Sequence, residues 1–266
     1  MRHLRAIVRA GALIVWTLLM YAALVLGLPF VFAFKNAVHR WRGLVFHKWA
    51  KLAAAILGVK VAVRGAPPAP PFLLVSNHLS YVDVLVFASR LKCVFVARGD
   101  AAGWPVIGSL CRGVNTIFID RQNRKDVARV NGLIDQALDE GRGVVLFAEG
   151  TSSRGDTVLP FKSSLLEQAA RASLGVSYAA ISYRTLEGEP SAHLSVCWWG
   201  EMTFVKHVIG LLYLTEVEAT VSFGAQPIQA NNRKMLAEKL WSVVRGQFIP
   251  PTEGRPQQAD PVAGQR

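Results

Sequence analysis

A long uncharged stretch near the amino terminus constrains the fold of this chain more than any other feature. No Asp, Glu, Lys or Arg occurs between Ala10 and Phe34, and about 20 apolar residues are enough for a helix to cross a bilayer. The stretch is too long for the apolar core of a signal peptide. Basic residues flank both of its ends, so charge does not choose an orientation. We expect a helix that dips into one leaflet, with a single crossing as the second interpretation.

The segment from Lys35 to Leu57 has a different pattern. Its apolar residues, which include Trp41 and Trp49, recur at helical spacing, and its basic residues lie off that stripe. Tryptophan beside cations is typical of a helix in the headgroup layer. We therefore expect residues 1–57 to form a membrane-anchoring helical pair. The alternative, two ordinary core helices, fits poorly with so long an uncharged run.

Short apolar strands alternate with helical patterns over the rest of the chain. This alternation predicts an α/β fold, with a mixed central sheet flanked by helices, as one domain over residues 58–249. Residues 250–266 are rich in Pro, Gln, Gly and charge, which predicts a disordered tail. Strands are expected at 59–63, 72–75, 93–97, 116–119, 144–147, 176–183, 194–199 and 218–223, and helices at 82–88, 101–111, 125–140, 163–174, 202–214 and 232–248.

Charge and cysteine content limit the partners. A formal net charge of +12 favours nucleic acid, anionic lipid or a phosphorylated substrate. The basic residues cluster near the apolar amino terminus and within helices, and no nucleic-acid-binding motif occurs, so we expect membrane lipid and no nucleic acid. The three cysteines lack metal-ligand spacing. They are expected to be buried free thiols in a reducing compartment, with no metal site.

One histidine stands where an α/β sheet binds ligands. His78 follows the predicted strand 72–75, and Asp83 lies on the first turn of the next helix. A carboxylate at this distance can hold one ring nitrogen and leave the other able to take a proton from a substrate. The spacing alone is a weak signal, because such a pair also arises by chance and His78 can equally cap a helix.

Polar residues follow two further predicted strands. Asp120 and Arg121 follow one strand, and Glu149, Gly150 and Thr151 follow another. If these strand ends meet at one edge of the sheet, a base, a cation and a turn with available backbone amides fit a phosphorylated hydroxyl substrate. The chain has no Walker-type loop, zinc spacing or Gly-x-Ser-x-Gly elbow, which argues against a nucleotide hydrolase, a metallohydrolase or a serine esterase.

Three ordered blocks resemble the motifs of the 1-acylglycerol-3-phosphate acyltransferase (PlsC-like) family. Residues 77–83 are similar to its Asn-His-x-Ser-x-x-Asp block, residues 117–121 to its second block, and residues 147–151 to its Phe-Pro-Glu-Gly-Thr block. The resemblance covers about Lys35 to Gln229. It implies a bacterial enzyme on the cytoplasmic face of the inner membrane. Such an enzyme moves an acyl group from acyl-CoA or acyl-carrier protein to the hydroxyl of a lysolipid, without a metal or other cofactor.

The resemblance also implies roles for the site residues. His78 would act as general base and Asp83 would fix its tautomer, with no covalent acyl-enzyme. Arg121 would bind the acceptor headgroup, although a salt bridge to Asp120 is the structural alternative. Glu149 would order its loop. Gly150 and Thr151 would lend backbone amides to the substrate.

One departure from the family concerns the acceptor. Ser152 replaces an Arg that is thought to help hold the acceptor phosphate, so Arg154, Arg98 or Lys162 must stand in if phosphate is bound. Residues 198–204 resemble a bacterial subgroup that includes acyltransferases for lyso-ornithine lipid, an acceptor with an amine and a carboxylate. We expect lysophosphatidic acid by a small margin over lyso-ornithine lipid. A non-catalytic basic membrane-binding protein is the alternative from a different class.

Overall fold

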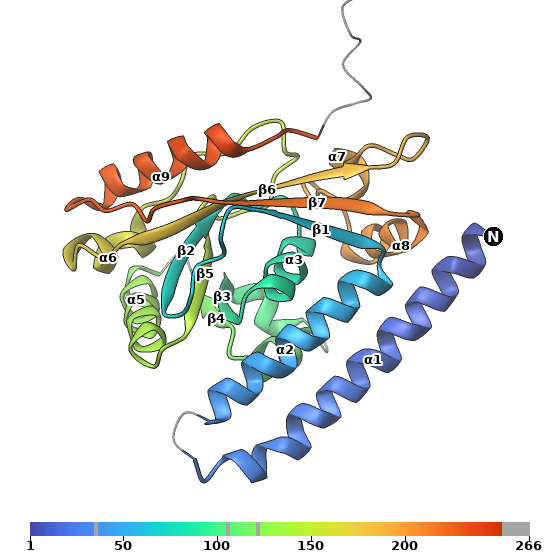
Figure 1. Ribbon diagram of the computed structural model, residues 1–266, viewed down its shortest axis with the longest axis horizontal. Coiled ribbons are helices and arrows are strands. Elements are labelled where there is room, and N and C mark those ends of the chain that lie inside the picture. The colour runs from blue at the N-terminus through green and yellow to red at the C-terminus, as the bar shows by residue number, and fades with distance from the viewer. Residues whose placement is uncertain (35–36, 105–106, 121–122, 252–266) are drawn as a thin grey trace, which may run out of the picture.

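The computed structural model describes residues 1–34, 37–104, 107–120 and 123–251, and every structural statement below concerns those residues. Two long antiparallel helices open the chain, α1 (Arg2–Val31) and α2 (Ala37–Ile56) (Figure 1). Among the described helices, α1 alone is long and apolar enough to cross a membrane by length and composition, with a mean hydropathy of 2.2. Only 6% of its most apolar window is buried inside the protein, so its apolar surface faces outward.

Within the described residues a seven-stranded sheet follows, in the order β1-β7-β6-β2-β5-β3-β4. From β6 to β4 along this order the strands are parallel, whereas β7 and β1 run in the opposite direction. The mixed sheet predicted from the sequence is therefore confirmed. The strands are β1 (Val59–Arg64), β2 (Phe72–Ser76), β3 (Cys93–Arg98), β4 (Ile117–Ile119), β5 (Gly143–Phe147), β6 (Val176–Thr185) and β7 (Val217–Phe223).

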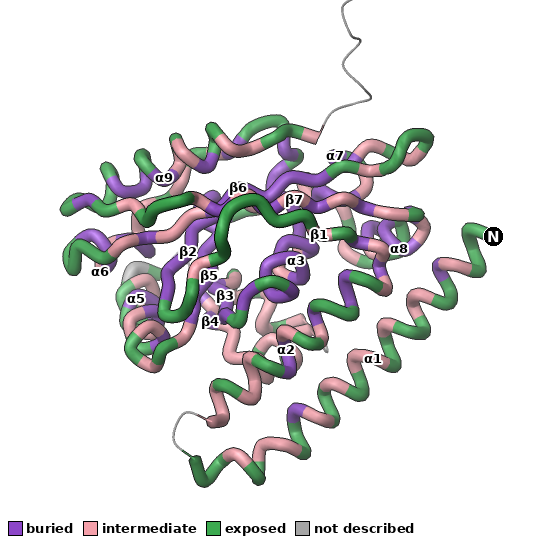
Figure 2. Tube along the Cα trace, viewed as in Figure 1, coloured by how far each residue is buried: buried purple, intermediate pink, exposed green. Residues whose placement is uncertain are grey.

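Helices cover both faces of the sheet, and the central strands are buried between them (Figure 2). The inner residues of α2, α3, α7 and α8 share one apolar core with one face of the sheet, and those of α5, α6 and α9 share a second core with the other face. This double cover explains why β2 and β5 are continuously apolar instead of alternating. The remaining helices are α3 (Val82–Arg90), η1 (Gly99–Gly103), α4 (Ile107–Gly113), α5 (Arg124–Asp139), η2 (Ser164–Leu166), α6 (Glu167–Arg171), α7 (Ala192–Ser195), α8 (Phe204–Tyr213) and α9 (Arg233–Gln247).

The strand predicted at 194–199 is wrong. Its first residues end the short helix α7, where the N–H groups of Val196 and Cys197 bond to the carbonyl of Ala192 at 2.8 and 2.9 Å. Both side chains are fully buried, and a short apolar run cannot distinguish a buried turn from a strand. The next N–H, that of Trp198, donates to the carbonyl of Leu79 over 2.8 Å. The segment thus packs onto the turn that carries His78.

Two predicted helices differ from expectation, one by being divided and the other by ending early. The helix expected at 101–111 consists of η1 and α4, with residues 105 and 106 outside the described part. The helix expected at 163–174 ends with α6 at Arg171. Beyond it, Ser173 has a φ of 48° and the N–H of Leu174 bonds to the carbonyl of Ala169 at 2.8 Å, which closes the helix end.

The two amino-terminal helices pack on the domain and on each other. Trp41 Nε1 donates to the carbonyl of Leu24, and Trp49 Nε1 donates to Thr17 Oγ1, so both rings of α2 join it to α1. The headgroup role that the sequence suggested for the tryptophans stays a prediction. Further along α2, Ala53 and Ala54 are 0% and 3% exposed in the core shared with α3. The boundary predicted after residue 57 therefore lies within one packed core.

Arginines fasten the first turns of α1 to the end of α8. Arg5 donates to the carbonyl of Tyr213, and Arg9 donates to the carbonyls of Leu214 and Thr215, the last over 2.9 Å. The final carbonyls of a helix have no partner within the helix, so cations favour that end. The start of α1 is thus held against the domain, and α2 holds the rest of its length.

Candidate active site

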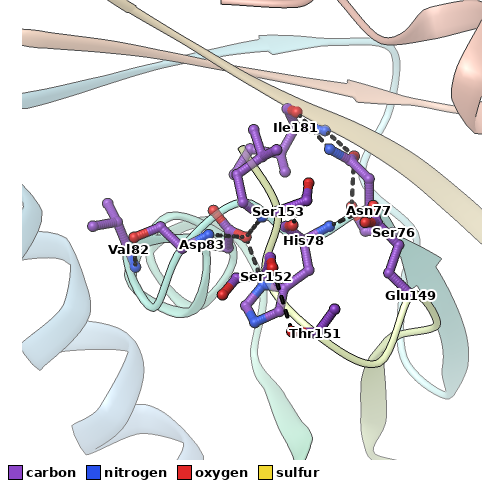
Figure 3. A network of polar contacts seen from close by, with 12 residues as sticks. Ser76, Asn77, His78, Val82, Asp83, Glu149, Thr151, Ser152, Ser153 and Ile181 are labelled. Atoms are coloured by element: carbon purple, nitrogen blue, oxygen red, sulfur yellow. Dashed lines mark hydrogen bonds and ion pairs between the residues drawn. The ribbon is translucent and has the colours of Figure 1, made fainter. Parts of the chain in front are cut away.

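His78 stands directly beyond the carboxyl end of β2. The residue between them, Asn77, is fully buried and bonds to Ile181 of β6 through both side-chain atoms. Its Nδ2 donates to the carbonyl over 2.9 Å, and its Oδ1 accepts from the N–H over 2.8 Å (Figure 3). The amide thereby continues the pairing of β2 with β6 for one more residue. This anchoring fixes the point at which the chain leaves the sheet, and hence the position of His78.

His78 and Asp83 form the predicted pair. Nδ1 of His78 lies 2.7 Å from Oδ2 of Asp83. Asp83 is fully buried, whereas the His78 side chain is 20% exposed. With Nδ1–H donating to the carboxylate, Nε2 carries the lone pair, which is the form a general base needs. The helix geometry predicted from the sequence is confirmed, because Asp83 is the second residue of α3.

The Asp83 carboxylate accepts hydrogen bonds on both oxygens. Oδ2 also accepts from the backbone N–H groups of Leu79 and Ser80, over 2.7 and 3.1 Å. Oδ1 accepts from the hydroxyl of Tyr183 on β6 over 2.7 Å. A buried carboxylate is tolerated when such donors replace water. These contacts fix the carboxylate in the orientation that holds the imidazole.

Tyr183 is a site residue that the sequence did not reveal. Burial, and then the neighbouring Asp83 charge, raise the pKa of its hydroxyl well above the ordinary value. The hydroxyl therefore stays protonated and donates to Asp83. Sequence offered no signal for it, since tyrosines are common in the apolar strands of any buried sheet and β6 contains two of them. The contact depends on the pairing of β2 with β6, which brings residues 100 positions apart together.

Glu149 holds the backbone of the turn that carries His78. Its Oε1 accepts from the backbone N–H of His78 over 3.0 Å, and its side chain is almost fully buried. Burial raises the pKa of Glu149 to about 8, the nearby Asp83 charge adds to this, and hydrogen bonds from the His78 and Leu159 backbones oppose it. The predicted role of ordering its loop agrees with these contacts. The carboxyl is protonated at neutral pH.

The turn after β5 is closed by a hydrogen bond from its own backbone amide at Gly150. Gly150 has a φ of 80°, a conformation suited to glycine, and its N–H bonds to the carbonyl of Phe147 at 3.1 Å. The amide of Gly150, expected to serve a substrate, is therefore taken up within the turn. Thr151 is exposed, and its Oγ1 donates to the carbonyl of Ser152 over 3.3 Å. Two residues on, the N–H of Ser153 bonds to the carbonyl of His78.

Phe147 supports the imidazole from one side. The two rings stack with centroids 4.2 Å apart and an angle of 13° between their planes. Phe147 is the last residue of β5, the strand next to β2. A stacked aromatic ring limits rotation of the imidazole and excludes water from one of its faces. The sequence placed Phe147 in a motif block but assigned it no role.

The predicted headgroup cations lie at or beyond the ends of neighbouring strands. Arg98 ends β3 and pairs with Asp100 over 3.0 Å. Arg154 pairs with Asp156 over 3.5 Å, and its guanidinium lies 5.4 Å from the centre of the Trp199 ring. Arg121 lies outside the described residues. Arg98 and Arg154 are thus each matched by a carboxylate two residues away.

Aromatic rings adjoin the catalytic turn. Phe204, at the start of α8, lies 5.0 Å from Tyr81, 5.4 Å from Trp104 and 6.3 Å from Trp198, centre to centre. Tyr81 belongs to the turn between His78 and Asp83. The turn is therefore joined to α8 by this cluster of four rings.

A buried histidine of α8, His207, also joins this helix to the catalytic turn. His207 Nδ1 lies 2.8 Å from the hydroxyl of Tyr81, and Nε2 lies 3.1 Å from the carbonyl of Cys197. Because the carbonyl can only accept, Nε2 carries the hydrogen and Tyr81 donates to Nδ1. Burial lowers the pKa of His207, opposed by the bond to Cys197. His207 is therefore a neutral structural link and not a second base.

Other places in the described part of the chain offer less chemistry. No three His, Cys, Asp or Glu side chains there lie close enough to hold a metal ion. A groove of about 650 Å³ lies between α5, α6 and α9 and is lined mainly by polar side chains. None of the predicted site residues lines it. The chemistry is concentrated at the carboxyl ends of β2 and β5, where an oriented imidazole can take a proton from a bound hydroxyl.

Comparison with protein families agrees with this location. The family model described as Acyltransferase matches residues 60–184, which include β2, β5 and the whole His78 turn. A lyso-ornithine lipid O-acyltransferase of Rhizobium meliloti is 33% identical, over 78% of this chain and 78% of that protein. A protein of the same name from Brucella abortus is 30% identical, over 82% and 86%.

Two further proteins are similar. A 1-acyl-sn-glycerol-3-phosphate acyltransferase of Neisseria gonorrhoeae is 29% identical, over 73% of this chain and 76% of that protein. The crystal structure of the 1-acyl-sn-glycerophosphate acyltransferase PlsC from Thermotoga maritima superposes with a TM-score of 0.58. The superposition covers 92% of this chain and 97% of the PlsC chain, at 19% sequence identity. At that identity the likeness concerns the fold alone.

Proposed function

Because the chain belongs to the acyltransferase family and is an acyltransferase of lysolipids, we propose that His78 and Asp83 carry the reaction and that lyso-ornithine lipid is the acceptor. The observation that supports the chemistry is the 2.7 Å contact between His78 Nδ1 and a fully buried carboxylate. The second part of the proposal differs from the acceptor that the sequence alone favoured.

The proposed reaction begins at Nε2 of His78. This nitrogen takes the proton of the acceptor hydroxyl, and the oxygen attacks the carbonyl carbon of an acyl thioester. The carbon–sulfur bond then breaks, and the imidazolium returns the proton to the departing sulfur. Asp83 stabilises the imidazolium while it exists. A positioned general base contributes roughly 10²–10⁴-fold to such a rate.

The acyl donor in this proposal is acyl-CoA or acyl-carrier protein. Both present the acyl group as a thioester, whose thiol leaves more readily than an alcohol. No further cofactor is needed, because deprotonation and attack account for every bond that changes.

Paired charges near the site support the choice of acceptor. Arg98 and Arg154 are each matched by an aspartate, and a phosphate dianion binds best to cations that are not already neutralised. An acceptor that carries both an amine and a carboxylate complements such pairs, since each charge of the ligand finds its opposite. The two relatives of at least 30% identity described above also carry the lyso-ornithine name.

Lysophosphatidic acid is the second candidate acceptor. The similarity to the Neisseria gonorrhoeae 1-acyl-sn-glycerol-3-phosphate acyltransferase supports it, as does the presence of Arg121 in the sequence. Exposed ion pairs contribute little, about 0–1 kcal/mol, so Arg98 and Arg154 can exchange their aspartates for a phosphate.

Purified protein in nanodiscs, offered both lysolipids with labelled acyl-CoA and acyl-carrier protein, tests the acceptor. We expect faster transfer to lyso-ornithine lipid, and a loss of that transfer in both Arg154→Ala and Asp156→Asn. Arg171→Ala is the matched control, because Arg171 forms an exposed pair with Glu167 on α6, away from His78. Transfer to lysophosphatidic acid alone would overturn the acceptor and leave the acyltransferase assignment standing.

We also propose that α1 and α2 hold the enzyme on a membrane as a helical pair in one leaflet. The outward apolar face of α1 supports a membrane location. The bonds from Arg5 and Arg9 to the end of α8 favour a helix lying along the domain over one that leaves it to cross the bilayer. In this proposal the catalytic domain faces the cytoplasm at the bacterial inner membrane, where the thioester donors are found. Labelling of a cysteine near Pro250 from outside intact cells would contradict this sidedness.

A further inference from the structure

Helix α8 has an outward face that the anchoring helices do not account for. Val205 is 65% exposed and Ile209 is 46% exposed, one turn apart on the same side, and exposed Lys206 lies between them. The opposite side of α8 is buried, with His207 8% and Leu211 1% exposed. Soluble surfaces carry single apolar side chains routinely, but two β-branched residues one turn apart on a short apolar helix call for an explanation.

The helix that carries this face packs against the start of α1. The two helices are fastened by Arg5 and Arg9, and Arg2 lies 5.3 Å from the ring of Tyr213, the last residue of α8. In the first turns of α1, Leu4 and Ile7 are 67% and 69% exposed. Figure 1 shows the start of α1 beside α8 at the same end of the molecule.

α8 is also bonded to the catalytic turn. His207 accepts from Tyr81, and the loop before α8 donates through Trp198 to the carbonyl of Leu79. Leu79 in turn donates its N–H to Asp83. Whatever surface α8 touches is therefore held at a fixed distance from the His78–Asp83 pair.

We propose that α8 is a second lipid-contacting element. Val205 and Ile209 enter the headgroup and upper acyl layer of the leaflet that holds α1, and Lys206 pairs with anionic headgroups there. Through Tyr81 and Leu79 this contact sets the height of His78 above the lipid from which the acceptor comes. The inference rests on the membrane location proposed above, and it adds a contact outside residues 1–57.

A fluorescent probe at position 205 tests the contact. Val205→Cys, in a Cys111→Ser background, is labelled with an environment-sensitive dye and reconstituted into vesicles of phosphatidylcholine and phosphatidylglycerol. Cys93 and Cys197 are buried, so the new thiol takes the label. We expect a blue shift and quenching by spin-labelled lipid. Met235→Cys on α9, which is 54% exposed on the other face of the sheet, should show neither.

A second probe separates this inference from the membrane proposal itself. Leu18→Cys lies on the outward face of α1, at 64% exposure. Quenching at residue 18 without quenching at 205 would overturn the role of α8 and leave the anchoring by α1 intact. Absence of quenching at both positions would overturn both. A blue shift at position 205 that depends on protein concentration and not on lipid would indicate that this face contacts a second copy of the chain. That result would also overturn the lipid contact of α8.

Substitution gives an independent readout. Val205→Asp with Ile209→Asp should lower acyl transfer from vesicle-embedded acceptor roughly tenfold, since two apolar side chains no longer enter lipid. Transfer to acceptor dissolved in detergent micelles should keep the wild-type rate. Met235→Asp is the control and should change neither rate. An equal loss in micelles and vesicles would show damage to the fold or to the site, and would contradict the proposal.

Discussion

The hydroxyl of Tyr183 lies 2.7 Å from Oδ1 of Asp83, and the two residues are separated by 100 positions in the chain. Asp83 is the second residue of α3, which follows β2, whereas Tyr183 lies within β6, so the contact depends on the pairing of β2 with β6. The carboxylate that orients His78 is thus held by the sheet as well as by its own turn.

Tyr183→Phe should slow acyl transfer while leaving the KM for acceptor close to that of the wild type. The change removes one hydrogen bond to a buried charge, a contact typically worth ~1.5–3 kcal/mol, which corresponds to roughly a tenfold or larger effect. Steady-state kinetics in nanodiscs measure it. Tyr178→Phe on the same strand is the control and should keep the wild-type kcat. A raised KM with unchanged kcat would show that Tyr183 contacts substrate instead of positioning Asp83.

Glu149 predicts a specific dependence of stability on pH. Burial raises its folded pKa to about 8 from the ordinary value of 4.5. Between these values the folded protein binds more protons than the unfolded chain, so the contribution of Glu149 to the free energy of unfolding falls as pH rises through this window. Below the window and above it the contribution is constant.

Glu149→Gln should abolish that fall, because the amide does not titrate. Denaturant unfolding of both proteins, at pH values below, within and above the window, should show the variant gaining stability relative to the wild type as pH rises. Glu187→Gln, at an exposed turn, is the control. Parallel stability profiles for the wild type and Glu149→Gln would contradict a protonated Glu149 at neutral pH.

Asn77→Ala should destabilise the fold and not only the site. It leaves the buried N–H and carbonyl of Ile181 without the two bonds they make to the amide, at ~1–3 kcal/mol for each unsatisfied group. Thermal unfolding in detergent should show a clear drop in Tm. Asn231→Ala, at an exposed position outside the sheet, is the control and should keep the wild-type Tm. An unchanged Tm for Asn77→Ala would mean that β2 does not need this anchor.

Two truncations should behave differently. Deleting residues 1–34 removes α1 and should leave a folded domain that has lost most of its vesicle binding. Deleting residues 1–57 also removes α2, whose Ala50, Ala53 and Ala54 complete the core around α3, and it should yield aggregated protein. Flotation with vesicles and gel filtration compare them. A monodisperse product of the longer deletion, with the Tm of the shorter one, would refute this view of α2.

The sequence predicted the elements whose pattern is local. The strands around His78 are continuously apolar and bounded by turn residues, and both are found where expected. The His78–Asp83 contact was predictable for the same reason, because a turn and the first residues of a helix fix the distance between them. Residues 194–199 were predicted as a strand but form a helix end and a turn, because a short apolar run does not distinguish these structures.

Contacts that depend on strand order could not be predicted. Tyr183 reaches Asp83, and Asn77 reaches Ile181, only because β6 lies next to β2. The pairs Arg98–Asp100 and Arg154–Asp156 are local and do not depend on strand order. They are missed when the cations in the sequence are counted without asking which carboxylates lie beside them. Arg121, the cation given most weight there, lies outside the described residues and stays a prediction.

The most direct test of the proposed chemistry is the rate of acyl transfer by purified His78→Ala. Thiol release and labelled product should be measured together, with saturating thioester donor and both lysolipids, beside wild-type protein of equal Tm and equal vesicle binding. Loss of the general base should reduce both signals by roughly 10²–10⁴-fold while the fold and the membrane binding remain. Transfer by His78→Ala at close to the wild-type rate would contradict the account.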